Sequence, residues 1–215
     1  MKTFRAFTVI ELIFIIVLVA ILAAVAIPRI ERNGLIEAAD QLSSHIRYTQ
    51  QLAMNDNKFS ATDANWHRKS WRIEFDGTRY FIYSDMTPNG NPDGVPQLAE
   101  YAVDPMNPAK LLTSDGAGTN RTNQNVKLDL ATTYSIASIT LAGGCADQTH
   151  IAFDVKGRPM AINNNLYGGL YTTACQVILT NEVGHTATIF IQPETGYVGA
   201  TAAQSPNGDI LYAGF

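Results

Sequence analysis

The apolar run over residues 12–27 constrains this chain more than any other feature, because it holds no polar side chain and directly follows an acid, Glu11. A helix over residues 7–27 would be about 31 Å long, which is enough to cross the hydrocarbon core of a bilayer. A carboxylate in hydrocarbon costs roughly 2.5–3.5 kcal/mol on insertion scales unless it finds a partner. The sequence therefore predicts a membrane segment in which Glu11 has a specific role.

Two general interpretations of this segment leave something unexplained. Lys2 and Arg5 before the run, and small residues at 24–26, are typical of a cleaved secretory signal, although the run is long and holds a glutamate near its start. A plain single-pass anchor with its basic end in the cytoplasm explains the length and the charges. It does not explain Glu11.

A third interpretation rests on a resemblance to a known family. Residues 2–12, Lys-Thr-Phe-Arg-Ala-Phe-Thr-Val-Ile-Glu-Leu, resemble the processing signature of type IV pilins and type II secretion pseudopilins. The resemblance implies cleavage by a prepilin peptidase between Ala6 and Phe7, where Ala6 stands in place of the family's usual glycine. It also implies N-methylation of Phe7 and an assembly role for Glu11, which would pair with the terminal amine of a neighbouring subunit.

Three later stretches, residues 42–53, 153–159 and 189–198, are similar to H-type minor pseudopilins and to the minor pilins that prime type IV pili. This similarity implies a structural subunit, not an enzyme, that is assembled into or primes a type II secretion pseudopilus or a type IV pilus. Its partners would be other pilin or pseudopilin subunits, the prepilin peptidase, an inner-membrane assembly platform and, before assembly, membrane lipid. It would lie in the bacterial inner membrane as a single-pass protein with a periplasmic C-terminal domain. The alternative is a binding module displayed on the filament, either a tip adhesin or a DNA-uptake receptor.

The remainder of the chain predicts a helix followed by strands. The helix is expected to continue over residues 29–55, where residues at spacings of three and four give one mostly apolar face: Leu35, Ala39, Leu42, Ile46, Thr49 and Ala53. Strands are expected at 71–75 and 79–83, joined by a turn at Asp76-Gly77, and at 134–141, 149–155, 175–180 and 187–191.

The sequence thus predicts an α+β, pilin-like fold. One long N-terminal helix, with a membrane half and an amphipathic half, would pack on antiparallel β-sheet. The expected parts are a leader peptide at 1–6, a transmembrane and assembly helix at 7–28, its amphipathic continuation at 29–55, and a β-rich globular domain at 56–215.

Cys145 and Cys175 are the only cysteines in the chain. If the apolar run sends the rest of the chain across a membrane, both lie in an oxidising compartment, where pairing is the normal outcome. We therefore expect a disulfide between them, with two buried thiols as the alternative.

A turn-rich stretch at residues 89–100 fits the spacing of a calcium loop. Asn89, Asn91, Asp93 and Glu100 would occupy positions one, three, five and twelve, and Val95 would offer its backbone carbonyl. Prolines inside the stretch and the lack of expected flanking helices favour the alternative, an ordinary surface loop. Calcium is thus a possible cofactor, and the sequence predicts no other.

A basic cluster of His67, Arg68, Lys69 and Arg72 lies beside the two tryptophans. It could make a small nucleic-acid contact or be a solvated strand edge, and the formal net charge of −4 favours the solvated edge. Nucleic acid is therefore not an expected partner. The chain also lacks the hydrolase, zinc-protease and phosphate-loop motifs, so we expect no enzymatic activity.

Overall fold

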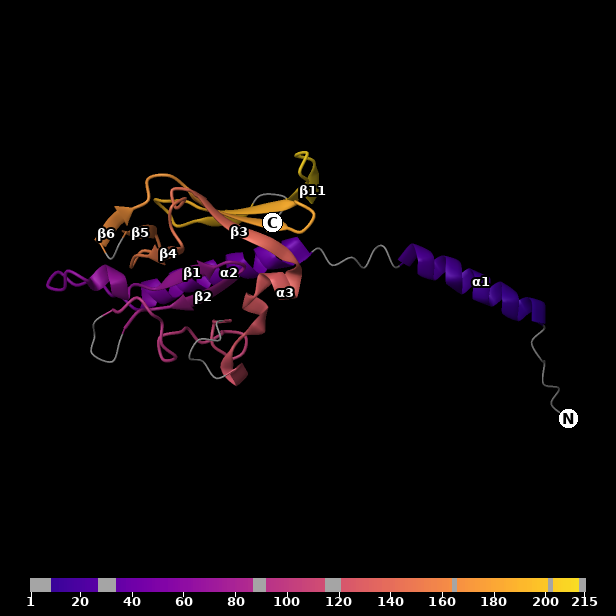
Figure 1. Ribbon diagram of the computed structural model, residues 1–215, viewed down its shortest axis with the longest axis horizontal. Helices are drawn as coiled ribbons and strands as arrows, with labels where there is room; N and C mark the ends of the chain where they lie inside the picture. The colour runs from indigo at the N-terminus through magenta and orange to yellow at the C-terminus, as the bar shows by residue number, and fades with distance from the viewer. Residues whose placement is uncertain are drawn as a thin grey trace. The chain divides into compact units, whose positions relative to one another are not determined.

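The computed structural model describes residues 9–26, 34–86, 92–114, 121–163, 166–200 and 203–212 (Figure 1). The chain divides into two compact units, Met1–Asn33 and Gly34–Phe215. The first unit contains the helix α1 (Val9–Ala26), and the second begins with the helix α2 (Gly34–Asn55). The folded core belongs to the second unit.

The predicted single long N-terminal helix is wrong, because α1 and α2 are separate elements. α1 ends two residues before Pro28, and proline disfavours a helical conformation of the residue before it and removes a backbone donor. With 18 residues, α1 is about 27 Å long, shorter than the expected 7–28 segment. Among the described residues, no helix has both the length and the apolar character that a membrane crossing requires, which contradicts the predicted single-pass location in the inner membrane.

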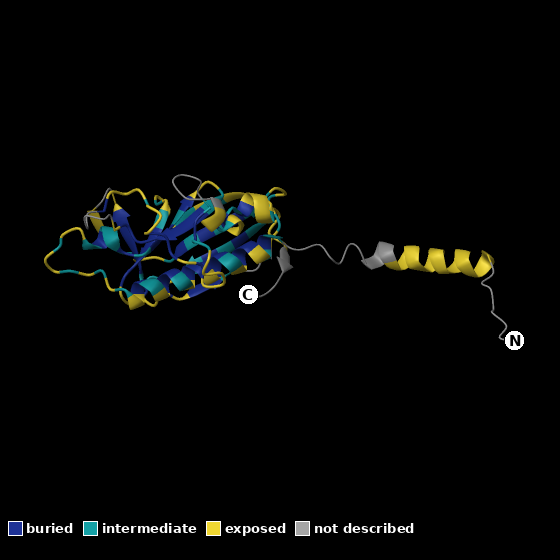
Figure 2. Ribbon diagram, turned by 90° about the horizontal axis from the view of Figure 1, so that it is seen from below, coloured by how far each residue is buried: buried dark blue, intermediate teal, exposed yellow. Residues whose placement is uncertain are grey.

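The apolar face predicted for α2 is confirmed. Every residue that the sequence analysis placed on it is buried: Leu35, Ala39, Leu42, Ile46, Thr49 and Ala53. This face packs against strands of both sheets and forms much of the main hydrophobic core. Figure 2 shows the buried side of α2 turned toward the strands and its exposed side turned to solvent.

Two antiparallel sheets complete the second unit, so the α+β class is correct. The first sheet has the strand order β2-β1-β4-β5-β6. Its strands are β1 (Arg72–Asp76), β2 (Arg79–Tyr83), β4 (His150–Phe153), β5 (Pro159–Asn163) and β6 (Leu166–Leu170). The second sheet has the order β11-β10-β8-β7-β3, with β9 beside β8. Its strands are β3 (Ile136–Gly143), β7 (Cys175–Asn181), β8 (Thr186–Ile191), β9 (Val198–Ala200), β10 (Ala203–Gln204) and β11 (Ile210–Tyr212).

Short helices connect these strands: η2 (Trp66–Lys69), η3 (Arg121–Asn123), η4 (Val126–Leu128) and α3 (Leu130–Tyr134). The predicted strand at 134–141 therefore begins too early, because Tyr134 ends α3. Asp129 caps the start of α3 by accepting a hydrogen bond from the backbone N–H of Thr132, and Ser135 ends it with a φ of 57°. The chain enters β3 only after this left-handed residue.

Candidate functional site

The helix α1 presents an almost wholly apolar surface that its own unit does not cover. Across residues 9–22, its large apolar side chains are between 44 % and 76 % exposed (Figure 2). Contiguous apolar surface of this kind is typical of an interaction site, because removing each apolar side chain from water is favourable. We refer to the exposed side chains of residues 9–22 as the α1 surface.

Glu11 is the acidic residue of the first turn of α1. A negative charge is favourable there, because the unpaired N–H groups at the start of a helix give that end a partial positive charge. Ala6 and Phe7, the predicted cleavage residues, lie outside the described residues. The structure thus places one of the three processing and assembly residues, at the N-terminal end of the α1 surface.

The predicted disulfide is confirmed. Cys145 and Cys175 are bonded, with their Cα atoms 5.1 Å apart, and both are fully buried. The bond joins the turn after β3 to the first residue of β7, next to the pairing of Gly143 with Cys175. It therefore fixes one end of the second sheet.

Two of the predicted calcium ligands act as caps of tight turns. Asp93 accepts a hydrogen bond from the N–H of Val95 at 2.9 Å, and Glu100 accepts one from the N–H of Gln97 at 2.7 Å. The buried carboxylate of Asp85 also holds this loop, since it accepts from the N–H groups of Asp93 and Gly94.

Asn89 and Asn91 lie outside the described residues. Within the part of the chain that the structure describes, no three acidic, histidine or cysteine side chains are grouped to hold a metal ion. Calcium binding by this loop stays a prediction.

The basic cluster does not form one exposed patch. Arg72 is buried, stacks over the ring of Tyr83 at 5.0 Å, and donates to the backbone carbonyls of Arg68 and Ser70. Lys69 pairs with Asp63 at 2.7 Å. Two of the four basic side chains are therefore engaged in holding η2 and β1.

The three stretches that carry the later resemblance meet around Gln50. This α2 side chain is buried, and its Nε2 donates to the carbonyl oxygens of Gly157, at 2.8 Å, and Gly196, at 2.6 Å. Gly157 and Gly196 lie in the other two stretches. Gln50 was not among the residues predicted to be functional, although its place four residues after Ile46 and three before Ala53 puts a polar amide on the apolar face.

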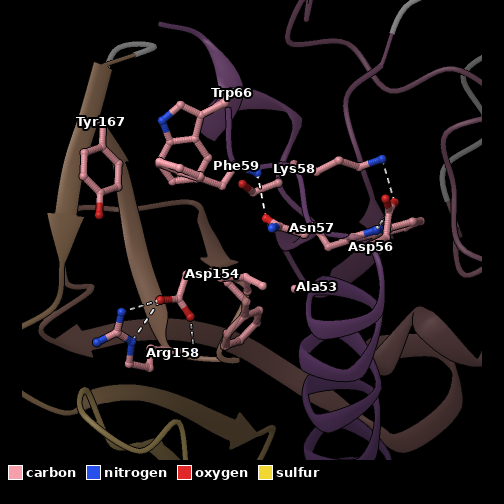
Figure 3. Close-up of a pocket in the computed structure, with 13 residues that line it drawn as sticks. Ala53, Asp56, Asn57, Lys58, Phe59, Trp66, Asp154, Arg158 and Tyr167 are labelled. Atoms are coloured by element: carbon pink, nitrogen blue, oxygen red, sulfur yellow. Dashed lines mark hydrogen bonds and ion pairs between the residues drawn. The ribbon is translucent and has the colours of Figure 1, made fainter. Parts of the chain in front are cut away.

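The second unit also contains a cavity of about 420 Å³ that the sequence does not predict (Figure 3). Trp66 and Trp71 line it together with Phe59 and Tyr167. In the sequence, the two tryptophans stand out only as neighbours of the basic cluster. Tyr167 is so distant in sequence that no local pattern could have connected it to them.

Comparison of the chain with protein-family models, with curated proteins and with solved structures found no match. The resemblance to pilins and pseudopilins therefore rests on the residues of this chain alone.

Proposed function

We propose that the protein is a structural subunit of a pilin-like filament, a minor pseudopilin or minor pilin that joins or primes its assembly. In this proposal a prepilin peptidase removes residues 1–6, Phe7 becomes the methylated N-terminus, and α1 packs against the α1 helices of other subunits. The globular unit Gly34–Phe215 is carried on the filament.

The observation that carries this proposal is the α1 surface. It lies on the helix of the unit Met1–Asn33, and the described residues of that unit leave it uncovered. Helices of the same type provide a matching cover, because apolar helix faces associate by interdigitating their side chains.

Glu11 gives this association a specific register. The α-amine created by cleavage before Phe7 would be a cation, and Glu11 follows Phe7 by four residues in the sequence. In a staggered arrangement, the amine of one subunit pairs with the carboxylate of the next. An unpaired charge is costly in an apolar contact. The stagger that pairs the amine with the carboxylate is therefore favoured over staggers that bury either charge without its partner.

Replacement of Glu11 by alanine tests this proposal. We expect Glu11→Ala to be cleaved normally but to be absent from sheared filaments, because the pairing is lost while the cleavage residues are retained. Glu37→Ala, which removes an exposed acid from α2, is the matched control and should be incorporated normally. Incorporation of Glu11→Ala at the level of the unmodified protein would refute the pairing.

A further inference from the structure

The cavity beside the end of α2 is built from elements that are far apart in the chain. Its wall includes residues of the turn after α2, the short helix η2, the β4–β5 turn and β6. Its volume of about 420 Å³ lies in the range of small-molecule sites. We call it the aromatic pocket.

Aromatic rings form one side of the aromatic pocket. Trp66 packs against both Phe59 and Tyr167, with ring centroids 5.1 Å and 5.3 Å away, respectively (Figure 3). Phe59 is 58 % exposed and Tyr167 is 48 % exposed. The protein therefore holds three packed rings in contact with solvent, an arrangement that leaves apolar ring surface without a partner.

Two ion pairs form the polar part of the pocket. The carboxylate of Asp154 pairs with the guanidinium of Arg158 at 2.7 Å, and that of Asp56 pairs with the ammonium of Lys58 at 2.6 Å (Figure 3). Asp56 also accepts a hydrogen bond from the indole N–H of Trp71 at 2.9 Å. Each carboxylate is paired with one cation, so the net formal charge of these four side chains is zero.

This balance of charge selects the class of ligand. A cationic ligand would have to displace Lys58 or Arg158 from its carboxylate, and an anionic ligand would have to displace a carboxylate from its cation. A purely apolar ligand would cover those N–H donors of Arg158 that do not bond to Asp154 and would offer them no acceptor. A neutral ligand with one apolar face and many hydroxyl groups satisfies both sides of the pocket.

We propose that the aromatic pocket binds a neutral pyranose sugar. The axial C–H groups of the sugar ring stack on the electron-rich faces of Trp66 and Tyr167. Its hydroxyls bond to the paired side chains, where Arg158 uses Nε and one Nη toward Asp154 and keeps further N–H donors. This inference is independent of the proposed filament function, because it concerns only the globular unit.

The two tryptophans of the chain both line the pocket, so intrinsic fluorescence reports on this site directly. The full-length protein, held in a detergent without a sugar headgroup, is titrated with cellobiose, lactose and diacetylchitobiose. Choline, glucuronate and oligothymidylate are the cationic, anionic and nucleic-acid comparators. We expect a saturable change with at least one of the three sugars and weaker binding of every comparator.

Substitutions in the aromatic pocket test whether the sugar binds there. By calorimetry, Trp66→Ala and Tyr167→Ala should each weaken sugar binding by about tenfold, whereas Trp66→Phe, which keeps a ring, should lose less. Tyr197→Ala, which removes an exposed tyrosine of another aromatic pair, should bind like the unmodified protein. No saturable response to any of the three sugars, tighter binding of a comparator, or unchanged affinity in both alanine variants would overturn the proposal.

Discussion

The side-chain Nε2 of Gln50 lies 2.6 Å from the carbonyl oxygen of Gly196 and donates a hydrogen bond to it. The same nitrogen donates to Gly157, so one α2 amide holds the β4–β5 turn and the turn after β8 together. Both acceptors are backbone oxygens that α2 shields from water. The position therefore requires a side chain with two donors in the middle of an apolar helix face.

Gln50→Leu should lower the free energy of unfolding by about 2–3 kcal/mol, because leucine fills the space but leaves two shielded carbonyls without a donor. Gln51→Leu is the matched control, since Gln51 is the exposed neighbour on the same helix, and it should change stability little. Chemical denaturation of the three proteins gives the comparison. Equal stability of the two variants would show that the Gln50 bonds contribute nothing.

Gly196→Ala should be more destabilising than Gly77→Ala. Both glycines have left-handed backbones, with φ of 66° and 62°. A Cβ at Gly196 would collide with the carbonyl oxygen of Gly157, whereas a Cβ at Gly77 would have no atom within 4 Å. We expect about 1–2 kcal/mol for Gly77→Ala from backbone strain, and roughly 1–3 kcal/mol more for Gly196→Ala from the collision. Thermal melts that show equal losses would refute the close approach of the two turns.

Removal of the disulfide should destabilise the globular unit strongly. Cys145 and Cys175 are 30 residues apart in sequence, a loop length for which a cross-link contributes on the order of 3–4 kcal/mol. The double variant Cys145→Ser/Cys175→Ser should therefore melt at a lower temperature. Unmodified protein under strong reducing conditions should match it, and a reduced protein that keeps its full stability would contradict this expectation.

His150 should make the fold less stable in mild acid. Burial, together with the nearby charge of Arg72, lowers the pKa of His150 from 6.5 to about 4. Between these values the unfolded chain binds a proton that the folded chain does not, so stability falls as the pH decreases. Between pH 7 and pH 5, this group alone should remove about 2 kcal/mol of stability.

His150→Gln, which cannot be protonated, isolates this contribution. The raised pKa of Glu74, caused mainly by burial, acts in the opposite direction in the same protein and is present in both variants. Urea denaturation at pH 7 and pH 5 should thus show a smaller loss for His150→Gln than for the unmodified protein. If both proteins lose the same free energy of unfolding between pH 7 and pH 5, groups other than His150 cause the acid sensitivity.

Local patterns predicted the parts of the fold that local interactions determine. The period of the α2 face and the β1–β2 hairpin at Asp76-Gly77 were correct because burial and turn geometry act over a few residues. β5 and β6 were missed, since β5 is buried nearly throughout instead of alternating and β6 has two glycines at its centre. The aromatic pocket was missed because Tyr167 reaches Trp66 only through the pairing of β5 with β6 and the packing of that sheet on η2.

The prediction of one long N-terminal helix, which relied on the length of the apolar run, was wrong. The apolar run and the helical spacing that follows it favoured a continuous helix, but α1 ends at Ala26 and α2 starts at Gly34, with Pro28 between them in sequence. A proline removes one backbone donor and disfavours a helical conformation of the residue before it, two local effects that hydropathy does not reflect.

The intact mass of the protein isolated from its own cells tests the central claim most directly. The proposed subunit predicts a mature chain that begins at Phe7 and carries one methyl group on its α-amine. A chain that retains Met1–Ala6 without modification, or one that begins at Ile27 after removal of a secretory signal, would contradict a pilin-like subunit.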